Sequence, residues 1–390
     1  MGELNQEGKK PGRQYFSANS RTFITVRIIQ PLPLKETRTI KETLYHYEVP
    51  TSYDNLTICI FTRNRPKQLT NTLRYLGRIG VSVVILDASE QKFDFDFDSN
   101  VTYLNTPGMP IDARFIMFSK LVKTKYILLS PDDDFFLPGG LEISLNYLES
   151  NPDYSSVQGL RIRLIRDPKF RWIPDYTMQA HLVFDSDNSI ERLRLMSISM
   201  HYVYAIQRTD IFTEIVNCLE DTHTNVRDAD AKIELVFNYL LPLFGKHRIL
   251  PVLYSARTSH KFEGHDIQFS NWINNPCERS ALKFKSNIHE IYVSKLDCTI
   301  SEARKLEGEL TAFFSQIEND TDGSLGMNNT KTPRFLVYTK KFINWSLLRH
   351  LYPISKRNYI RYFIILVKGK HLRLFLNDLF LLLRYLKSSQ

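Results

Sequence analysis

A chain of 390 residues, with 43% hydrophobic and 12% aromatic residues, can bury one large core or two smaller ones, which excludes an intrinsically disordered protein. The net charge of +9 is unevenly placed. Residues 331–390 contain thirteen Lys and Arg but a single acidic residue, so the first 330 residues sum to about −3. The four cysteines form no CxxC pair, which argues against a zinc site or a disulfide framework and favours a reducing compartment. No signal-peptide core and no apolar run of roughly 18 residues is found, so we expect a cytoplasmic protein.

Strand-like and helix-like segments alternate from residue 56 onward. Strands are predicted at LTICIFT (56–62), VSVVILDAS (81–89), VTYLNTP (101–107) and KYILLS (125–130), with helices at 66–80, 111–123 and 137–152. A strand at 155–166, helices at 189–200, 210–219 and 230–245, and a late strand at 247–257 follow. This order predicts an α/β fold with a mainly parallel sheet that is covered by helices on both faces.

The pattern of predicted strands, helices and charged residues divides the chain into three regions. Residues 1–52 are an N-terminal extension, residues 53–265 form the α/β domain, and residues 266–390 form a helical C-terminal region that ends in a basic amphipathic tail.

Three consecutive carboxylates, Asp132, Asp133 and Asp134, interrupt an apolar stretch directly after a predicted strand. In an open α/β sheet, ligands bind at the carboxyl edge of the strands, which is where this triplet is expected. Adjacent carboxylates raise one another's pKa values unless they share a cation, and oxygen ligands at this density suit Mg²⁺ or Mn²⁺. The alternative is a solvated acidic turn that caps the following helix, and the triplet alone favours neither interpretation.

Polar residues follow other predicted strands at the same edge. The first strand ends in FTRNRP, with Arg63, Asn64 and Arg65, and the second ends in LDAS, with Asp87. The next helix begins with IDARF, which contains Asp112 and Arg114. Each of these residues could be an ordinary surface charge or helix cap. Their recurrence along one rim instead favours a binding site for a phosphorylated ligand.

The blocks LTICIFTRNRPKQLTNTLRYL, VVILDASE, MPIDARFIMFSKLVKTKYILLSPDDDFFLPGGLE and GKHRILPVLYSARTSH, in this order, resemble the family-two-like glycosyltransferases with the GT-A fold. The resemblance covers roughly residues 55–262, and the acidic triplet followed by Phe-Phe-Leu-Pro is its most specific element. It implies a Rossmann-like sheet, a nucleotide-sugar donor and a divalent metal, Mn²⁺ or Mg²⁺.

The resemblance also implies roles for single residues. The base, ribose and diphosphate of the donor would be bound by Thr62, Arg63, Asn64, Asp87, Arg114 and Asp132. The metal would be held by Asp133 and Asp134, with His260 as a late ligand and His265 as its substitute. A surface histidine is an equal alternative for His260. The segment SMHYVYAIQRTD, with Met200, His201 and Tyr202, falls where the acceptor site is expected, although an aromatic-rich strand that packs into the core explains it equally well.

The general base is less clearly marked. The family places an acidic pair at the start of a late helix, and the matching stretch here reads NVRDADAKIELVFNYLL, with Asp228, Asp230 and Glu234. Asp230 and Glu234 are four residues apart, so both project from one helix face. We take Asp230 as the first candidate for the base and Asp228 as the second, while an ordinary polar helix face remains the alternative.

The basic tail mixes Lys and Arg with bulky apolar residues at helical intervals, which favours binding to an anionic membrane surface. The alternative is a helical subdomain that packs its apolar faces on the main domain. No nucleic-acid recognition motif accompanies the charge, so no nucleic-acid partner is expected.

These observations together predict a metal-dependent, inverting glycosyltransferase that acts on a glycan or lipid-linked acceptor in surface polysaccharide or glycolipid synthesis, on the cytoplasmic face of a membrane. Two other functions stay open. The first is a nucleotidyltransferase, which requires a Gly-rich phosphate loop that FTRNRP lacks. The second is a degenerate GT-A domain that serves as a membrane-associated interaction module.

Overall fold

The structure, a computed structural model, describes residues 53–165, 171–175, 184–196, 202–220, 229–258, 273–275, 278–321 and 374–379, together with Leu382 and Tyr385. The predicted N-terminal extension, residues 1–52, lies outside these residues.

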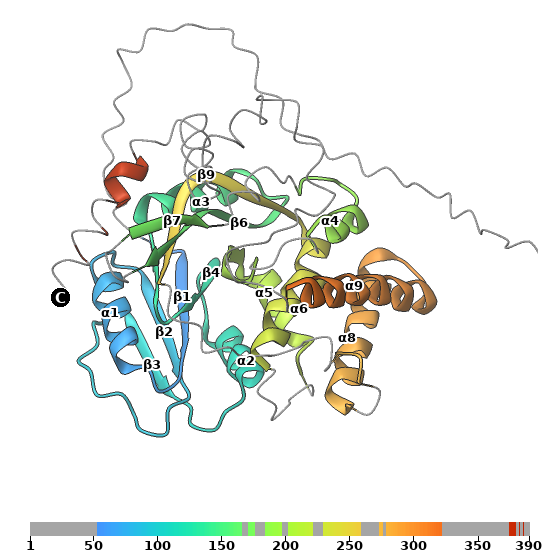
Figure 1. Cartoon of the computed structure of the whole chain (residues 1–390), viewed down its shortest axis with the longest axis horizontal. Helices are drawn as coiled ribbons and strands as arrows, with labels where there is room; N and C mark the ends of the chain where they lie inside the picture. The colour runs from blue at the N-terminus through green and yellow to red at the C-terminus, as the bar shows by residue number, and fades with distance from the viewer. Residues whose placement is uncertain are drawn as a thin grey trace, which may run out of the picture.

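Nine strands form one sheet in the order β3-β2-β1-β4-β8-β6-β9-β5, and β7 pairs with β6 (Figure 1). The strands are β1 (Leu56–Thr62), β2 (Ser82–Asp87), β3 (Val101–Asn105), β4 (Tyr126–Pro131), β5 (Asp134–Phe136), β6 (Tyr154–Ile165), β7 (Arg171–Asp175), β8 (Ile206–Arg208) and β9 (Lys246–Thr258). The helices are α1 (Pro66–Gly77), α2 (Ile111–Leu121), α3 (Pro138–Ser150), α4 (Ser189–Met196), the 3₁₀ helix η2 (Tyr202–Tyr204), α5 (Thr209–Asn217), α6 (Ala229–Phe244), α8 (Arg279–Leu296) and α9 (Ile300–Thr321). The predicted α/β fold is confirmed.

The first half of the sheet is parallel: α1 joins β1 to β2, the segment 88–100 joins β2 to β3, and α2 joins β3 to β4. β2 and β4 flank β1, and all three strands run in the same direction. Their β-branched and aliphatic residues, such as Ile58, Ile85 and Leu128, are fully buried, as expected for strands that are covered on both faces. The register pairs Thr62 with Asp87 and Asp87 with Asn105, so the carboxyl ends of β1, β2 and β3 are level.

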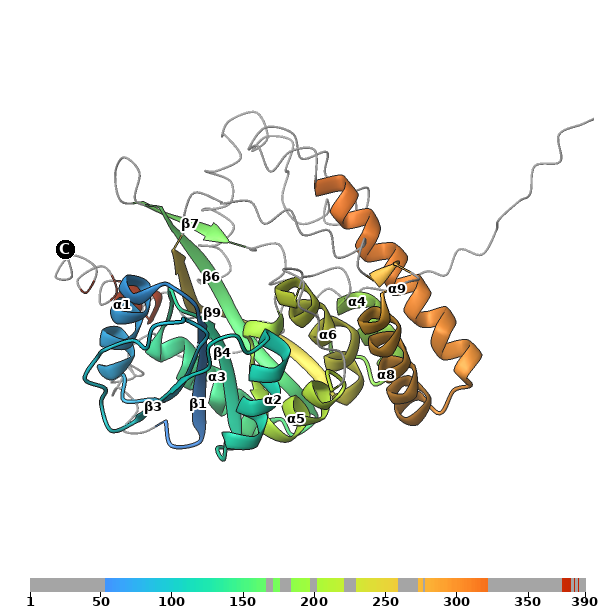
Figure 2. The same ribbon diagram turned by 90° about the horizontal axis from the view of Figure 1, so that it is seen from below.

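Helices cover both faces of the sheet. α1 connects β1 to β2, whereas α2 connects β3 to β4 in the opposite direction along the sheet, so right-handed crossovers place these two helices on opposite faces. Figure 2 shows α1 and α3 on one side and α2, α5 and α6 on the other. Gly140 brings α3 directly onto β9, since a Cβ atom there would lie 2.3 Å from the carbonyl oxygen of Leu253.

The second half of the sheet departs from the expected parallel arrangement. β8 is antiparallel to both of its neighbours, β5 is antiparallel to β9, and β7 is antiparallel to β6. The sequence did not predict β5 or β7. β5 has only three residues, and its partner β9 lies more than a hundred residues further along the chain, so no local periodicity marks it.

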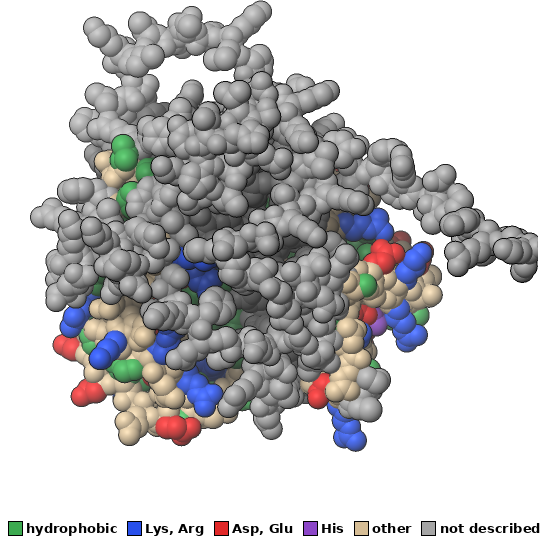
Figure 3. Space-filling view, in the orientation of Figure 1, with side chains coloured by type: hydrophobic (Ala, Val, Ile, Leu, Met, Phe, Trp, Pro, Cys, Tyr) green, Lys and Arg blue, Asp and Glu red, His purple; other side chains and the backbone are tan. Residues whose placement is uncertain are grey.

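The C-terminal helices α8 and α9 pack on α6. The hydroxyl groups of Tyr239 and Thr311 are 2.9 Å apart, and Tyr292 donates a hydrogen bond to the carbonyl oxygen of Tyr239 at 3.2 Å. None of the helices among the described residues has the length and apolar character needed to cross a bilayer. On the described surface at the lower left of Figure 3, Lys and Arg side chains are interspersed with Asp and Glu.

Candidate functional site

Two of the predicted residues meet where the strand order of the sheet reverses. The chain runs from β1 outward to β2 and β3 and then returns to β4 on the other side of β1. Thr62 is the last residue of β1, and Asp132 directly follows β4. The Thr62 hydroxyl donates a hydrogen bond of 2.7 Å to Asp132 Oδ2. Such a topological switch point is where open α/β sheets bind their ligands.

Arg65 joins two carboxylates of the acidic triplet. Its guanidinium contacts Asp132 Oδ1 at 2.5 Å and Asp133 Oδ2 at 2.7 Å. The side chains of Asp132 and Asp133 are 2% and 13% exposed, whereas Arg65 is 37% exposed and reaches solvent. Burial of Asp132 raises the pKa of its carboxyl group to about 6, although Thr62 and Arg65 act to lower it. Partial burial lowers the pKa of Arg65, but the carboxylates outweigh this and raise it overall.

Asp87, at the end of β2, is held by a network of hydrogen bonds. Its Oδ1 accepts from the Ser89 backbone N–H at 2.9 Å and from the Ser89 hydroxyl at 2.5 Å, and its Oδ2 accepts from Tyr103 at 2.8 Å. Burial, together with this bond to Asp87, raises the pKa of Tyr103 to about 12. The Asn64 backbone N–H donates to the Ser89 hydroxyl at 2.7 Å, and Asn64 has a left-handed φ of 56°. The loops after β1 and β2 are therefore tied together.

Arg114 lies beneath this edge of the sheet, on α2. Its guanidinium donates to the carbonyl oxygens of Leu86 at 3.1 Å and Thr62 at 3.5 Å and lies over the ring of Phe61. Arg114 is buried, so it supports the ends of β1 and β2 from within. Arg63 and Asn64, in contrast, are exposed beside Thr62.

The acidic triplet is also held from behind by α1. The Thr72 hydroxyl donates to the carbonyl oxygen of Asp132 at 2.8 Å, and the Tyr75 hydroxyl donates to that of Phe136 at 3.1 Å. Asp134 is buried as the first residue of β5. The triplet is therefore a two-residue turn followed by the first residue of a strand. Asp132 and Asp134 are 2% and 1% exposed, so the alternative of a solvated acidic turn is wrong.

The expected metal ligands suit a hard divalent cation by their chemistry, since Asp133 and Asp134 are consecutive carboxylate residues close behind the end of β4. A cation there would share Asp133 with Arg65. Among the described residues, no cluster of three or more His, Cys, Asp and Glu side chains is arranged to hold a metal.

Several expected residues are not brought to this edge by the described part of the chain. Asp230 and Glu234 lie in the first turns of α6, as predicted, but the positions of their side chains are outside the described residues. Asp228, His260 and His265 are outside them too, as are Met200 and His201. Tyr202 is buried against His247, with ring centroids 4.7 Å apart, which agrees with the core interpretation of this stretch.

Sequence reasoning missed three residues that shape the site and the contacts of a fourth. Arg65 was placed at this edge as part of the FTRNRP motif, but its distance from the triplet in sequence concealed its ion pairs with Asp132 and Asp133. Tyr103, Thr72 and Tyr75 were counted as ordinary residues of a strand and a helix. Only the packing of α1 and β3 against the sheet edge makes them relevant.

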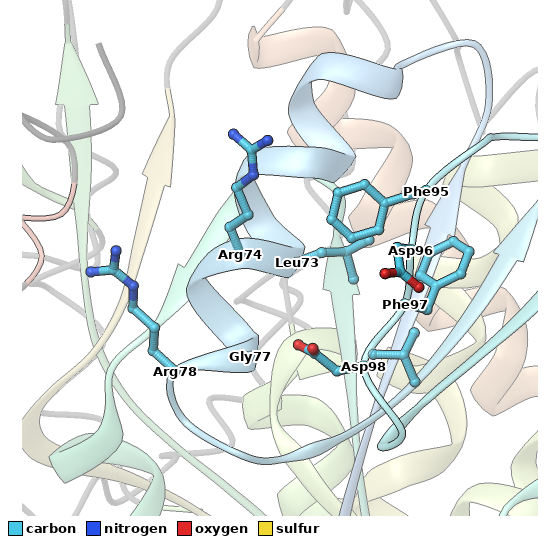
Figure 4. A pocket seen from close by; sticks show the side chains of 9 residues that line it. Leu73, Arg74, Gly77, Arg78, Phe95, Asp96, Phe97 and Asp98 are labelled. Carbon is cyan, nitrogen blue, oxygen red and sulfur yellow. The ribbon is translucent and has the colours of Figure 1, made fainter.

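The cavity in Figure 4 has a volume of about 320 Å³ and lies away from these residues. Arg74 of α1 and Arg78, directly after α1, stand on one side, and Phe95, Phe97 and Asp98 of the segment before β3 stand on the other. The second half of α1 and the first residue of β3 lie at the amino edge of the strands, so this cavity is not part of the candidate site.

Comparison with known proteins gives a distant likeness. No protein-family model matches the sequence, and no curated protein matches it. A crystal structure of S. aureus TarS 1–349 is similar over 70% of this chain and 75% of that chain, with 13% identity and a TM-score of 0.46. The same TarS fragment in complex with UDP-GlcNAc matches over 70% and 76%, with 14% identity and a TM-score of 0.46. Its complex with UDP matches over 66% and 70%, with 12% identity and a TM-score of 0.42. At these values the assignment of the α/β fold rests on the strand order and registers of this chain.

Proposed function

We propose that this protein is a glycosyltransferase that moves a sugar from a nucleoside-diphosphate donor to a hydroxyl group. The observation that carries the proposal is the polar network of Thr62, Arg65 and Asp132 at the switch point between β1 and β4. This is the position where an open α/β sheet binds a nucleotide. The order of the sequence blocks, which resembles family-two-like glycosyltransferases, supports the same class.

The donor nucleotide would lie across the carboxyl ends of β1, β2 and β4. Asp87 is oriented by Ser89 and Tyr103, so it can accept hydrogen bonds from the base or ribose. Asp132, once ionised, would accept from a ribose hydroxyl. Thr62, Arg63 and Asn64 would line the same pocket, with Arg114 supporting it from below.

The diphosphate needs compensating positive charge as the leaving group departs. Arg65 is charged and partly exposed, so it can contribute to this compensation at the mouth of the site. Asp133 and Asp134 would hold Mn²⁺ or Mg²⁺, with His260 as a further ligand, and the cation would stabilise the negative charge on the departing diphosphate.

A carboxylate at the start of α6 would take the proton of the acceptor hydroxyl as the oxygen attacks the anomeric carbon. The new glycosidic bond forms as the bond to the diphosphate breaks, so the configuration inverts and no covalent intermediate is needed. Asp230 is the first candidate for this base, followed by Asp228 and Glu234.

The proposed acceptor is a hydroxyl of a glycan or lipid-linked glycan at the cytoplasmic face of a membrane, in surface polysaccharide or glycolipid synthesis. The basic residues between 331 and 373, which lie outside the described residues, support membrane binding by their sequence alone. The full-length protein should float with vesicles that contain phosphatidylglycerol and lose this binding in high salt. Equal flotation with pure phosphatidylcholine vesicles would contradict the electrostatic part of the proposal.

Calorimetric titration with UDP and with GDP, each with and without Mn²⁺, tests the donor site. We expect Mn²⁺ to strengthen the binding of UDP or GDP and the Asp133→Ala variant to lose this binding. Asp94→Ala changes an exposed carboxylate outside the site, so this control should bind like the wild type. If the affinity for the nucleotide changes neither with Mn²⁺ nor in Asp133→Ala, the metal–diphosphate site is refuted. A screen for nucleoside diphosphate release from nucleotide sugars then identifies the donor.

A further inference from the structure

The end of the chain packs against the back of the candidate site. A short helix at residues 374–379, with Leu382 and Tyr385 beyond it, lies beside α1 (Figure 2, red). The buried apolar side chains of this segment are Phe375, Leu379, Leu382 and Tyr385. Leu376, on the other face of the helix, is 53% exposed. The apolar face of the segment is therefore buried in the hydrophobic core of the protein.

Tyr385 contacts α1 and β5 at the same time. Its hydroxyl donates a hydrogen bond of 2.7 Å to the carbonyl oxygen of Asn71. The centroid of its ring lies 5.4 Å from that of Tyr75 and 6.2 Å from that of Phe135, and the Arg78 guanidinium lies over the same ring, 4.8 Å from its centroid. Phe135 directly follows Asp134, so this contact reaches the residue next to the acidic triplet.

The same segment contacts the start of α3, the helix that follows the triplet. A Cβ atom on Gly139 would lie 2.4 Å from Leu374 Cδ1 and 2.8 Å from Asp378 Oδ2. This approach is possible because residue 139 has no side chain. The buried carboxylate of Asp378 thus lies at the N-terminal end of α3, where no side chain of the helix itself caps the backbone.

The C-terminal segment contacts both elements that adjoin the acidic triplet, α1 behind it and α3 after it. Thr72 and Tyr75 bind the carbonyl oxygens of Asp132 and Phe136 from α1, and Tyr385 packs on the ring of Tyr75. Asp378 and Leu374 press on α3 immediately downstream. A displacement of the C-terminal segment would therefore loosen the turn from both of its ends.

We propose that the helix at residues 374–379, together with Leu382 and Tyr385, acts as a clamp that positions the Asp132–Asp134 turn, with Tyr385 and Asp378 as its positioning residues. The significance of this clamp for donor binding rests on the proposed function, whereas its effect on the turn does not. While the clamp is docked, its apolar face is used within the protein and is not available to a membrane.

Hydrogen exchange measured by mass spectrometry on the full-length protein without nucleotide tests the clamp directly. Leu382→Ala removes a fully buried side chain, and Leu376→Ala is its matched control on the same segment. We expect Leu382→Ala to speed exchange in peptides that cover residues 131–141 about tenfold and to leave peptides of β1, β2 and β3 unchanged. Leu376→Ala should exchange like the wild type in both regions.

Two further variants separate the contacts. Tyr385→Phe retains the ring but loses the hydrogen bond to Asn71, so we expect a rise of about threefold in the exchange of residues 131–141. Gly139→Ala leaves the clamp sequence intact and places a methyl group against Leu374 and Asp378, so it should reproduce the effect of Leu382→Ala. The affinities of the same variants for UDP and GDP should fall in the same order, up to about tenfold.

The outcomes are distinct. The clamp is wrong if Leu382→Ala and Leu376→Ala show equal hydrogen exchange, or if the faster exchange extends uniformly over β1 to β3. If Leu382→Ala does not fold, the exchange of Tyr385→Phe is compared with that of Leu376→Ala instead. A wild type that binds neither UDP nor GDP would refute the proposed donor site but leave the exchange comparison valid.

Discussion

The acidic turn has two sides that are built from different interactions. On the front, Thr62 and Arg65 contact the side-chain oxygens of Asp132 and Asp133. On the back, Thr72 and Tyr75 contact backbone carbonyl oxygens, and the aromatic rings of Phe135 and Tyr385 pack behind them. The front is charged and open to solvent through Arg65, whereas the back is buried.

This difference separates recognition from support. A half-exposed guanidinium contributes little to stability because solvent screens it, yet it remains available to a charged ligand. Buried hydroxyl–carbonyl bonds and aromatic packing contribute to stability and fix the backbone that carries the carboxylates. Front variants should therefore change binding and catalysis, and back variants should change stability first.

The largest effect is expected on the front. Arg65→Ala removes the cation shared by Asp132 and Asp133, and we expect the rate of sugar transfer, measured by nucleoside diphosphate release, to fall about 10²- to 10³-fold. Arg65→Lys should be intermediate, since a lysine cannot bind two carboxylates with one planar group. Lys67→Ala, which removes an exposed cation in the first turn of α1, is the control. A loss of less than tenfold in Arg65→Ala would contradict its role.

A back variant should do the reverse. Thr72→Val retains the shape of the side chain but leaves the buried carbonyl of Asp132 without its donor, so the free energy of unfolding should fall by about 2 kcal/mol in urea denaturation. The matched control is Thr70→Val, whose hydroxyl binds the carbonyl of Pro66 within its own exposed helix turn. If the two variants unfold alike, the support from α1 is not significant.

The clamp gives the back of the turn a pH dependence. Burial, with a smaller contribution from Glu142 on α3, raises the pKa of Asp378 to about 7 against the lowering effect of the Gly139 backbone. Tyr53 and Tyr75 are other titratable groups nearby. Because the pKa is higher in the folded state, the contribution of Asp378 to stability is fully present below about pH 3.8 and is lost as the pH rises through about 7.

Asp378→Asn should therefore be more stable than the wild type by an amount that grows between pH 4 and pH 7 and levels off above it, on the order of 1–2 kcal/mol. Thermal unfolding at a series of pH values measures this, with Asp94→Asn as the exposed control. A difference that stays constant across this range would show that the carboxylate does not titrate in the docked segment.

The smallest effect is expected at the edge of the front side. Tyr103→Phe removes one of the donors to Asp87 but leaves the Ser89 bonds in place, so the affinity for UDP or GDP should weaken about threefold while stability changes little. Calorimetry on the variant and the wild type measures the difference. A loss as large as that of Arg65→Ala would mean that Asp87, and not the triplet, dominates binding.

The order of elements in the first half of the chain was predictable because each apolar run of a strand and each periodic face of a helix is a local signal. The strands ending at Thr62 and Asp87, and the position of Asp132 beyond β4, all follow from such runs. The helix that carries Asp230 and Glu234 was predictable for the same reason. Parallel strands level their carboxyl ends, so the sequence alone also determined which polar residues share one edge.

Tertiary structure alone decided which of these residues touch. The pairing of β5 with β9, the bridge from Arg65 to Asp132 and Asp133, and the packing of Tyr385 on Tyr75 join residues that are 67 to more than 300 positions apart. The periodicity of apolar residues within one helix or strand does not indicate contacts between residues so far apart in sequence. The tail shows this most clearly. Its basic and apolar pattern favours a membrane surface over an internal interface, whereas in the structure Phe375, Leu379, Leu382 and Tyr385 are buried. Tyr385 packs on α1 and β5, and Leu374 and Asp378 lie against the start of α3.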